Sequence, residues 1–404
     1  MNDLSHRKAT ARLRLLAADG TPIAGRPVEA AQTSHEFLFG CGAFHAIEMM
    51  RAKDAAQRDF LGERMDKWLG LFNYGTLPFY WGRYEPVPGQ TAKEPTLKAA
   101  SWLRERGVAV KGHPLCWHTV CADWLMQYDD EEILRRQIER IHRDVTDFRG
   151  VIDLWDVINE VVIMPDFDKY DNAVTRICKA KGRITLVREV FAAARESNPN
   201  ATLLINDFNI SEAYEILIEG LLEAGVPIDV IGIQSHQHQG YWGREKLESV
   251  LERFSRFGLP LHFTENTLIS GELMPGHIVD LNDWRVDAWP STPQGEERQA
   301  REIAEMYEIL FSHPRVTAIT TWDFCDDAWL HAPAGVIRTD NSEKPAYHAL
   351  RSLIHDQWQT RERLVTDKDG YVTFTGFKGG YTLTCEGRQA ELKLTQDTQA
   401  TLTL

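Results

Sequence analysis

The middle of the chain alternates short apolar runs with amphipathic helical segments. Apolar residues recur every three or four positions in residues 131–148, 185–196 and 297–311, which is typical of helices with one buried face. The runs between such segments have the length of buried strands, and they cover residues 37–39, 74–80, 108–115, 152–158, 202–207, 230–235, 261–265 and 318–323. Eight strand-then-helix units predict an α/β protein with a closed (β/α)8 TIM barrel, in which chemistry collects at the C-terminal ends of the strands.

The two ends of the chain follow another pattern, in which apolar and polar residues alternate as they do in half-buried strands. Residues 8–34 predict a hairpin around the turn D-G-T-P, and further alternating runs follow Arg363. Two strands alone are marginally stable, and the two ends joined resemble a small prealbumin-like or carboxypeptidase-regulatory-like β-sandwich. We therefore expect residues 1–35 and 359–404 to form one discontinuous all-β sandwich in which the barrel, residues 36–358, is inserted. Two separate β appendages are the alternative.

The charge pattern limits the kinds of partner. The chain carries a formal net charge of -14, with 59 Asp and Glu against 45 Lys and Arg, and no block of basic residues stands out. This balance argues against nucleic acid or an anionic membrane as a partner, and it suits a neutral substrate. The sequence does not indicate an oligomeric state.

The cysteines and the N-terminal residues bear on the compartment. Six cysteines in 404 residues show neither a disulfide framework nor zinc-ribbon spacing, which favours a reducing environment. The N-terminal residues lack the apolar run and cleavage site of a signal peptide, and no run of about 18 apolar residues occurs. As the sequence stands we expect a cytoplasmic protein, with export as the alternative if a signal segment had been removed.

Side chains suited to binding a sugar follow the predicted strands, with indole rings to stack on pyranose faces and carboxylates and amides for the hydroxyl groups. Glu160 follows the fourth strand and Glu265 ends the seventh, so the two carboxyl groups would face each other across the barrel mouth. Glycoside hydrolysis needs such a pair: one acid protonates the leaving oxygen, and one carboxylate attacks C1 or activates water. For either glutamate alone, a structural salt bridge is the alternative.

Motifs at successive strand ends form a recognisable set. They read Gly112-His113-x-Leu115-x-Trp117-His118, Trp155-Asp156-x-x-Asn159-Glu160, Gln234-x-His236, Thr264-Glu265 and Trp322-x-x-x-Asp326-x-x-Trp329, followed by Lys344-Pro345-Ala346-Tyr347. In this order, over about residues 36–355, the set resembles glycoside hydrolase family 10, the endo-β-1,4-xylanase family.

The resemblance implies catalytic roles for four residues. Glu160 would be the general acid/base and Glu265 the nucleophile of a double-displacement, anomer-retaining mechanism, with carboxyl groups roughly 5 to 5.5 Å apart. His236 would hydrogen-bond to Glu265 and orient it. Asn159 would contact the 2-hydroxyl of the sugar, where a bond that strengthens in the transition state accelerates the reaction.

The resemblance also implies a substrate-binding set. It consists of His113, Trp117, Gln234 and Trp322 around the attacked sugar, with Trp329 closing over it. We also expect Tyr80, which stands at the family's lysine position, to contact the substrate. Trp117 as a core residue and His118 as a structural histidine are the alternatives at those positions. His236 and His238 resemble half of a metal site, but no third ligand is evident, so we expect neither a metal nor a cofactor.

The stretch after the second strand departs from the family's pattern. Family members carry T-P-E-N-x-M-K-W there, whereas Thr76, Leu77 and Tyr80 occupy the Glu, Asn and Lys positions of this chain. A site that bonds sugar hydroxyls discriminates strongly through such polar partners. We therefore expect a substrate that differs from ordinary xylan.

The surroundings of the second carboxylate depart from the pattern as well. The usual T-E-L-D lacks its final acid, because residues 266–268 after Glu265 read Asn-Thr-Leu. A long segment, residues 267–296, follows and carries Trp284 and Trp289. Segments of this length without regular structure are usually functional or disordered. We expect this one to form a lid or a wall on the leaving-group side.

The sequence therefore predicts a retaining β-glycoside hydrolase for a xylan-related oligosaccharide, a decorated xylan fragment or another plant-type glycoconjugate. An ordinary endo-1,4-β-xylanase that acts on xylan chains is the first alternative. A non-catalytic carbohydrate-binding protein on a barrel scaffold is the second, although such a protein would usually have lost one of the two carboxylates.

Overall fold

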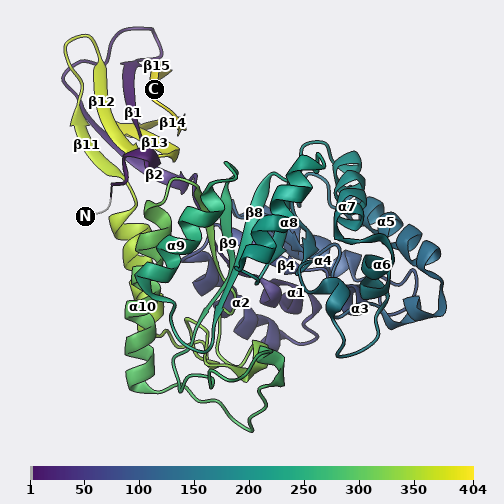
Figure 1. Cartoon of the computed structure of the whole chain (residues 1–404). Coiled ribbons are helices and arrows are strands. Elements are labelled where there is room, and N and C mark those ends of the chain that lie inside the picture. The colour runs from purple at the N-terminus through teal and green to yellow at the C-terminus, as the bar shows by residue number, and fades with distance from the viewer. Residues whose placement is uncertain (1–2) are drawn as a thin grey trace. The chain divides into compact units, whose positions relative to one another are not determined.

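The computed structural model describes residues 3–404, and its central feature is a closed barrel of eight strands (Figure 1). Around the barrel the order is β10-β3-β4-β5-β6-β7-β8-β9, and neighbours from β4 to β10 pair in parallel. The strands are β3 (Leu38–Gly42), β4 (Tyr74–Pro78), β5 (Ala109–His113), β6 (Leu154–Asn159), β7 (Thr202–Asp207), β8 (Val230–Gln237), β9 (Leu261–Leu268) and β10 (Val316–Thr321). This architecture confirms the predicted (β/α)8 TIM barrel.

Helices connect the strands, and side-chain caps define where several of them begin. The helices are α1 (Phe44–Arg51), α2 (Ala55–Leu69), α3 (Trp81–Tyr84), α4 (Lys93–Arg104), α5 (Asp130–Asp147), α6 (Ala173–Lys181), α7 (Arg183–Ser197), α8 (Glu212–Glu223), α9 (Gly243–Ser255), α10 (Pro293–Ser312) and α11 (Pro345–Arg351). Asp129 accepts a hydrogen bond from the backbone N–H of Glu132 at the start of α5, and Thr292 accepts one from Gly295 at the start of α10. These caps place the helix starts directly after the loops that carry the strand-end side chains.

The inside of the barrel contains an ion pair among apolar residues. The Lys111 Nζ lies 2.6 Å from the Asp156 Oδ2, and both side chains are fully buried. The Nδ1 of His113 lies 2.7 Å from the same oxygen. Packing around this group is tight, because a Cβ on Gly112 would lie 2.1 Å from the ring of Trp155. A buried charge needs its partner to be tolerated, so Lys111 and Asp156 hold His113 in a defined place at the end of β5.

Strands from both ends of the chain form two further sheets (Figure 1). The first sheet has the order β12-β1-β15 and the second β11-β2-β13-β14. Their strands are β1 (Lys8–Leu16), β2 (Pro27–His35), β11 (Arg361–Val365), β12 (Tyr371–Phe377), β13 (Gly379–Cys385), β14 (Arg388–Leu394) and β15 (Thr398–Thr403). Strand β1 pairs antiparallel with β12 and parallel with β15. Apolar residues of both sheets, among them Leu13, Val28 and Leu383, share one core.

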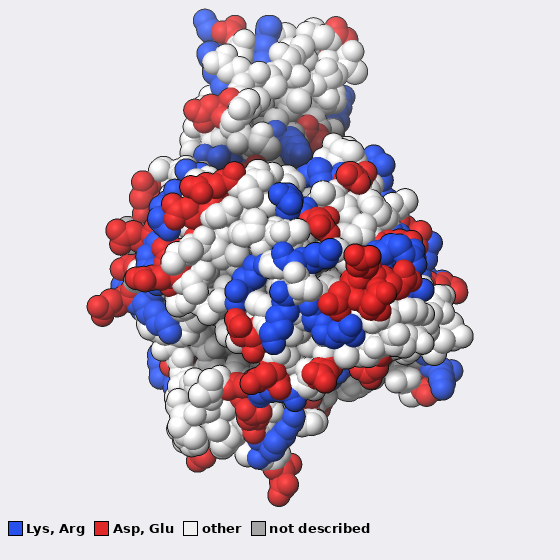
Figure 2. Space-filling view, turned by 45° about the vertical axis from the view of Figure 1, so that its right-hand side comes forward, with Lys and Arg blue, Asp and Glu red and all other residues white. Residues whose placement is uncertain are grey.

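The chain divides into two compact units. One comprises residues 3–38 together with His348–Leu404, and the other comprises Phe39–Tyr347, which contains the whole barrel apart from Leu38. A π-helical turn, Ser352–Gln357, follows α11 in the first unit. Within residues 3–404, no helix combines the length and the apolar character needed to cross a membrane. Figure 2 shows Lys and Arg side chains interspersed with Asp and Glu over the face in view.

Candidate active site

The two predicted catalytic glutamates lie at the C-terminal ends of β6 and β9. Glu160 directly follows β6 and has a φ of 56°, in the left-handed region that residues other than glycine rarely adopt. Its backbone N–H donates a 2.8 Å hydrogen bond to the carbonyl oxygen of Asn206 at the end of β7. Backbone strain of this kind persists only where the surroundings hold it, and it concentrates at functional sites.

The carboxyl group of Glu160 is held by two donors in a pocket that excludes most water. The indole Nε1 of Trp117 donates to Oε2 at 2.8 Å, and the Nε2 of Gln234 donates to Oε1 at 3.2 Å. The pKa of Glu160 is raised to about 8, chiefly by burial and in addition by the negative charge of Glu265, although both donors favour the charged form. Glu160 therefore carries a proton near neutrality and can donate it.

The surroundings of the Glu265 carboxyl group favour its ionised form, in contrast to those of Glu160. The Nδ2 of Asn206 donates to its Oε1 at 2.8 Å, and the Nε2 of His236 lies 3.0 Å from its Oε2. Burial by itself raises the pKa of Glu265, but His113, His236 and Lys111 outweigh burial, and the pKa is lowered. Glu265 is therefore ionised where Glu160 is protonated, which is the division of roles that acid catalysis and nucleophilic attack require.

A chain of side-chain amides connects the two carboxyl groups. The Nδ2 of Asn206 also donates to the Oδ1 of Asn159 at 2.8 Å, and the Nε2 of Gln234 donates to the same oxygen at 3.1 Å. The Oδ1 of Asn206 accepts a hydrogen bond from the Thr264 hydroxyl at 2.6 Å. Asn206 was not among the predicted site residues, and its position at the end of β7 was the one signal that pointed to it.

Aromatic rings surround the carboxyl groups. The ring of Tyr80 lies 5.6 Å from that of Trp117 and 5.8 Å from that of His113, measured between centroids. The ring of Trp322 lies 5.2 Å from His113, and that of Trp329 lies 4.6 Å from His236. Together with the hydrogen bonds above, these contacts bring all the predicted catalytic and substrate-binding residues into one cluster.

Thr76, Leu77 and Tyr80, the positions that depart from the family's pattern, differ in whether they belong to this aromatic cluster. Thr76 and Leu77 are fully buried, whereas Tyr80 is partly exposed and takes part in the cluster. Burial raises the pKa of Tyr80 well above its usual value, and the charge of Glu265 acts in the same direction. Tyr80 is therefore a neutral phenol at the position where the resemblance predicts a lysine.

The hydroxyl of Thr267 lies between two histidines at the place of the missing acid. Its Oγ1 is 3.3 Å from the Nδ1 of His236 and 3.3 Å from the Nδ1 of His238. Burial lowers the pKa of His238 to about 3, so that ring is neutral. Among residues 3–404, no group of three or more His, Cys, Asp or Glu side chains is arranged to hold a metal ion.

His118 lies beside the acid rather than in contact with the nucleophile. Its Nε2 is 4.0 Å from the Oε2 of Glu160, and its ring centroid is 4.5 Å from that of Phe167. Burial lowers the pKa of His118 to about 4, so it adds no positive charge next to Glu160 near neutrality.

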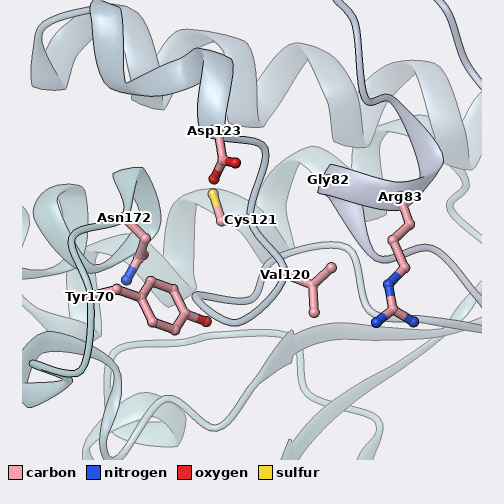
Figure 3. Close-up of a pocket in the computed structure, with 7 residues that line it drawn as sticks. All are labelled: Gly82, Arg83, Val120, Cys121, Asp123, Tyr170 and Asn172. Atoms are coloured by element: carbon pink, nitrogen blue, oxygen red, sulfur yellow. The ribbon is translucent and has the colours of Figure 1, made fainter.

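A pocket of about 310 Å³ adjoins the aromatic cluster (Figure 3). It is lined by Gly82, Arg83, Val120, Cys121, Asp123, Tyr170 and Asn172. In Figure 3 the hydroxyl of Tyr170 points toward Val120, and Arg83 lies on the far side of Val120. The guanidinium carbon of Arg83 is 5.8 Å from the centroid of the Tyr80 ring, so one residue that lines the pocket also lies against the aromatic cluster.

Comparison with known proteins identifies the family. Residues 79–353 match glycosyl hydrolase family 10. An endo-1,4-beta-xylanase/feruloyl esterase of Xylanibacter ruminicola is 27% identical over an alignment of 359 positions, which covers 80% of this chain and 47% of that protein. This chain thus spans about half the length of that relative. Endo-1,4-beta-xylanase B of Thermotoga neapolitana is 28% identical over an alignment of 297 positions, which covers 70% of this chain and 80% of that protein.

A solved structure supports the same assignment. Native xylanase 10B from Thermotoga maritima superposes with a TM-score of 0.65 at 25% identity, covering 80% of this chain and 96% of that one. The family match extends over well more than half of the chain, and it includes both glutamates. The chain therefore belongs to glycosyl hydrolase family 10.

Proposed function

We propose that this protein is a retaining β-glycoside hydrolase that cleaves a xylan-related oligosaccharide, in particular a decorated fragment. The observation that carries the proposal is the opposite perturbation of two carboxyl groups joined by one hydrogen-bonded chain: the pKa of Glu160 is raised to about 8, and that of Glu265 is lowered. A retaining glycosidase needs one protonated and one ionised carboxyl group at the same pH.

In the first step, the ionised Glu265 attacks C1 of the bound sugar while Glu160 gives its proton to the leaving oxygen, so the glycosidic bond breaks and a glycosyl ester forms. In the second step, the Glu160 carboxylate takes a proton from water, the water oxygen attacks C1, and the ester bond to Glu265 breaks. The hydrogen bonds from Trp117 and Gln234 stabilise Glu160 in its ionised form between the two steps.

Asn159 is placed to act on the sugar itself. Its Oδ1 accepts from both Gln234 and Asn206, and its Nδ2 donates to no other described residue. The Nδ2 is therefore the atom that can donate to the 2-hydroxyl of the attacked sugar. A bond of this kind accelerates the reaction to the extent that it strengthens in the transition state.

Two features support a decorated substrate rather than plain xylan. Thr76, Leu77 and Tyr80 stand where the resemblance predicts a Glu, an Asn and a Lys that contact the next sugar. Thr76 and Leu77 are buried, and Tyr80 is a neutral phenol, so these polar contacts would be lost. The pocket beside Tyr80 offers arginine, aspartate, asparagine and tyrosine side chains to a substituent. The names of the relatives favour a second candidate, an endo-1,4-β-xylanase that cleaves within xylan chains.

The test compares hydrolysis of linear xylohexaose, of xylo-oligosaccharides with sugar substituents, and of a series of aryl β-glycosides. Proton NMR of the first product should show the anomer of the substrate, and substituted oligosaccharides should give the highest kcat/KM. Rapid internal cleavage of linear xylohexaose would favour the second candidate. Failure to hydrolyse any β-glycoside, or an inverted first product, would contradict both.

A further inference from the structure

The segment between β9 and α10, residues 269–292, is fixed at its base by apolar packing. Ile269, Met274 and Trp289 of this crossing segment form a buried cluster with Ala332 and Ala334. A hydrogen bond of 2.8 Å from the indole Nε1 of Trp289 to the carbonyl of Glu272 closes the segment on itself. The base of the crossing segment is therefore a stable part of the structure.

The crossing segment then passes the end of β8. The backbone N–H of Met274 donates to the carbonyl of His238 at 2.9 Å, and the side chain of Gln239 donates to the carbonyl of Ile278 at 2.7 Å. These bonds direct the segment away from β9, where it begins, and toward the strands on the side of Glu160.

The far end of the crossing segment is held by one lysine. The Nζ of Lys169, in the loop between β6 and α6, lies 2.6 Å from the Oδ2 of Asp280 and 2.6 Å from the Oδ1 of Asp283. We call these three side chains the latch. Its side chains are 38%, 31% and 63% exposed, and exposed ion pairs are weak and sensitive to salt.

The loop that carries Lys169 packs next to the acid, and in the proposed mechanism the leaving group departs on the side of the acid. The ring of Phe167, two residues before Lys169 in the same loop, lies 4.5 Å from the ring of His118, measured between centroids. His118 in turn lies 4.0 Å from the carboxyl oxygen of Glu160, and Glu160 is the proton donor to the leaving oxygen in the proposed mechanism. The crossing segment consequently joins the loop after the nucleophile to the loop after the acid.

We propose that the latch limits the length of the leaving group, because it holds the crossing segment over the path that a continuing sugar chain would take. A short leaving group fits beneath the closed segment, whereas a longer chain binds only when Lys169 releases the two aspartates. This inference rests on the proposed glycoside hydrolase function and adds a determinant of substrate length. Lys169 is a positioning residue in this account, since it touches neither carboxyl group of the catalytic pair.

The test measures kcat/KM for xylohexaose and for an aryl β-xylobioside, whose leaving group is a single ring. The readout is the ratio of kcat/KM for xylohexaose to kcat/KM for the aryl β-xylobioside. Lys169→Ala should raise the ratio by about fivefold, chiefly through a lower KM for xylohexaose. The double variant Asp280→Asn and Asp283→Asn should reproduce this change. Lys179→Ala is the matched control, because it removes an exposed lysine from neighbouring α6 without touching the latch, and its ratio should equal that of the wild type.

Salt provides a second readout that loss of stability would not mimic. Added sodium chloride should raise the ratio for the wild type and leave that of Lys169→Ala unchanged, because screening acts only where the ion pairs exist. An unchanged ratio in Lys169→Ala, together with hydrolysis of the aryl glycoside at the wild-type rate, would overturn the latch and leave the proposed function intact. If the wild type hydrolyses neither substrate, the proposed function and the proposed role of the latch are both wrong.

Discussion

Replacing Trp117 by phenylalanine should shift the alkaline limb of the pH profile to higher pH. The indole Nε1 is 2.8 Å from the Oε2 of Glu160, and it stabilises the ionised form of this acid. Without the donor, the carboxylate loses a charge-assisted hydrogen bond, and the proton is held more tightly. The phenyl ring keeps most of the contact with Tyr80, so the change acts mainly on the acid.

The size of the shift follows from the bond that is lost. A hydrogen bond to a charged group contributes about 1.5 to 3 kcal/mol, which corresponds to about one to two pKa units. The bond from Gln234, at 3.2 Å, remains in the variant. The alkaline limb should therefore move from about pH 8, the value set by Glu160, to between about 9 and 10. Enzyme with a protonated Glu160 is the active form in the first step, so activity extends to higher pH.

The assay is kcat/KM as a function of pH for an aryl β-glycoside with a poor leaving group, which needs the acid. A matching substrate with a dinitrophenyl leaving group is the control, because its first step needs no proton and its alkaline limb should be weak in both proteins. Trp117→Phe also changes sugar binding, which alters the height of the profile without moving its limbs. An alkaline limb that stays in place, or moves to lower pH, would refute the reasoning.

Two further predictions concern charges around the pair. Glu265→Gln should lower the pKa of Glu160 from about 8 by about two units, because a charge roughly 5.5 Å away at an effective dielectric constant of about 20 contributes about 3 kcal/mol. Carbon NMR titration of labelled glutamate measures this, and a pKa that stays near 8 would contradict it. Lys111→Met should lower the free energy of unfolding by about 3 to 5 kcal/mol, since it removes the cation that pairs with the buried charge of Asp156 and leaves only the contact with His113. Denaturant unfolding measures the loss, and Lys111→Met with Asp156→Asn should recover part of it; full stability of the single variant would contradict the account.

The apolar runs were sufficient to predict the barrel, but strand ends rich in polar residues were harder to place. The run predicted at residues 202–207 coincides with β7, whereas β9 continues to Leu268, beyond its predicted end. Residues after Glu265 appear polar in sequence, yet they are buried because cross-strand side-chain bonds satisfy them, such as the bond between Ser235 and Asn266. Such pairing depends on register between strands, which a hydrophobic pattern does not contain.

The same limit applies to the site. Glu160 and Glu265 could be predicted because each stands alone as a carboxylate at a strand end. Asn206 could not be given its role, since its contacts run to side chains on two other strands, β6 and β9. Lys169 was unremarkable in sequence, because its partners lie in a segment more than a hundred residues away.

Trapping the covalent intermediate would show directly which carboxyl group is the nucleophile. The protein is incubated with its best aryl β-glycoside substrate carrying fluorine at the 2-position, which slows breakdown of the glycosyl ester more than its formation, and peptides are then analysed by mass spectrometry. We predict a stoichiometric mass increase on the peptide that contains Glu265, and none on the peptide that contains Glu160. A label on Glu160, or turnover of the parent substrate with inversion and no trapped ester, would contradict this prediction.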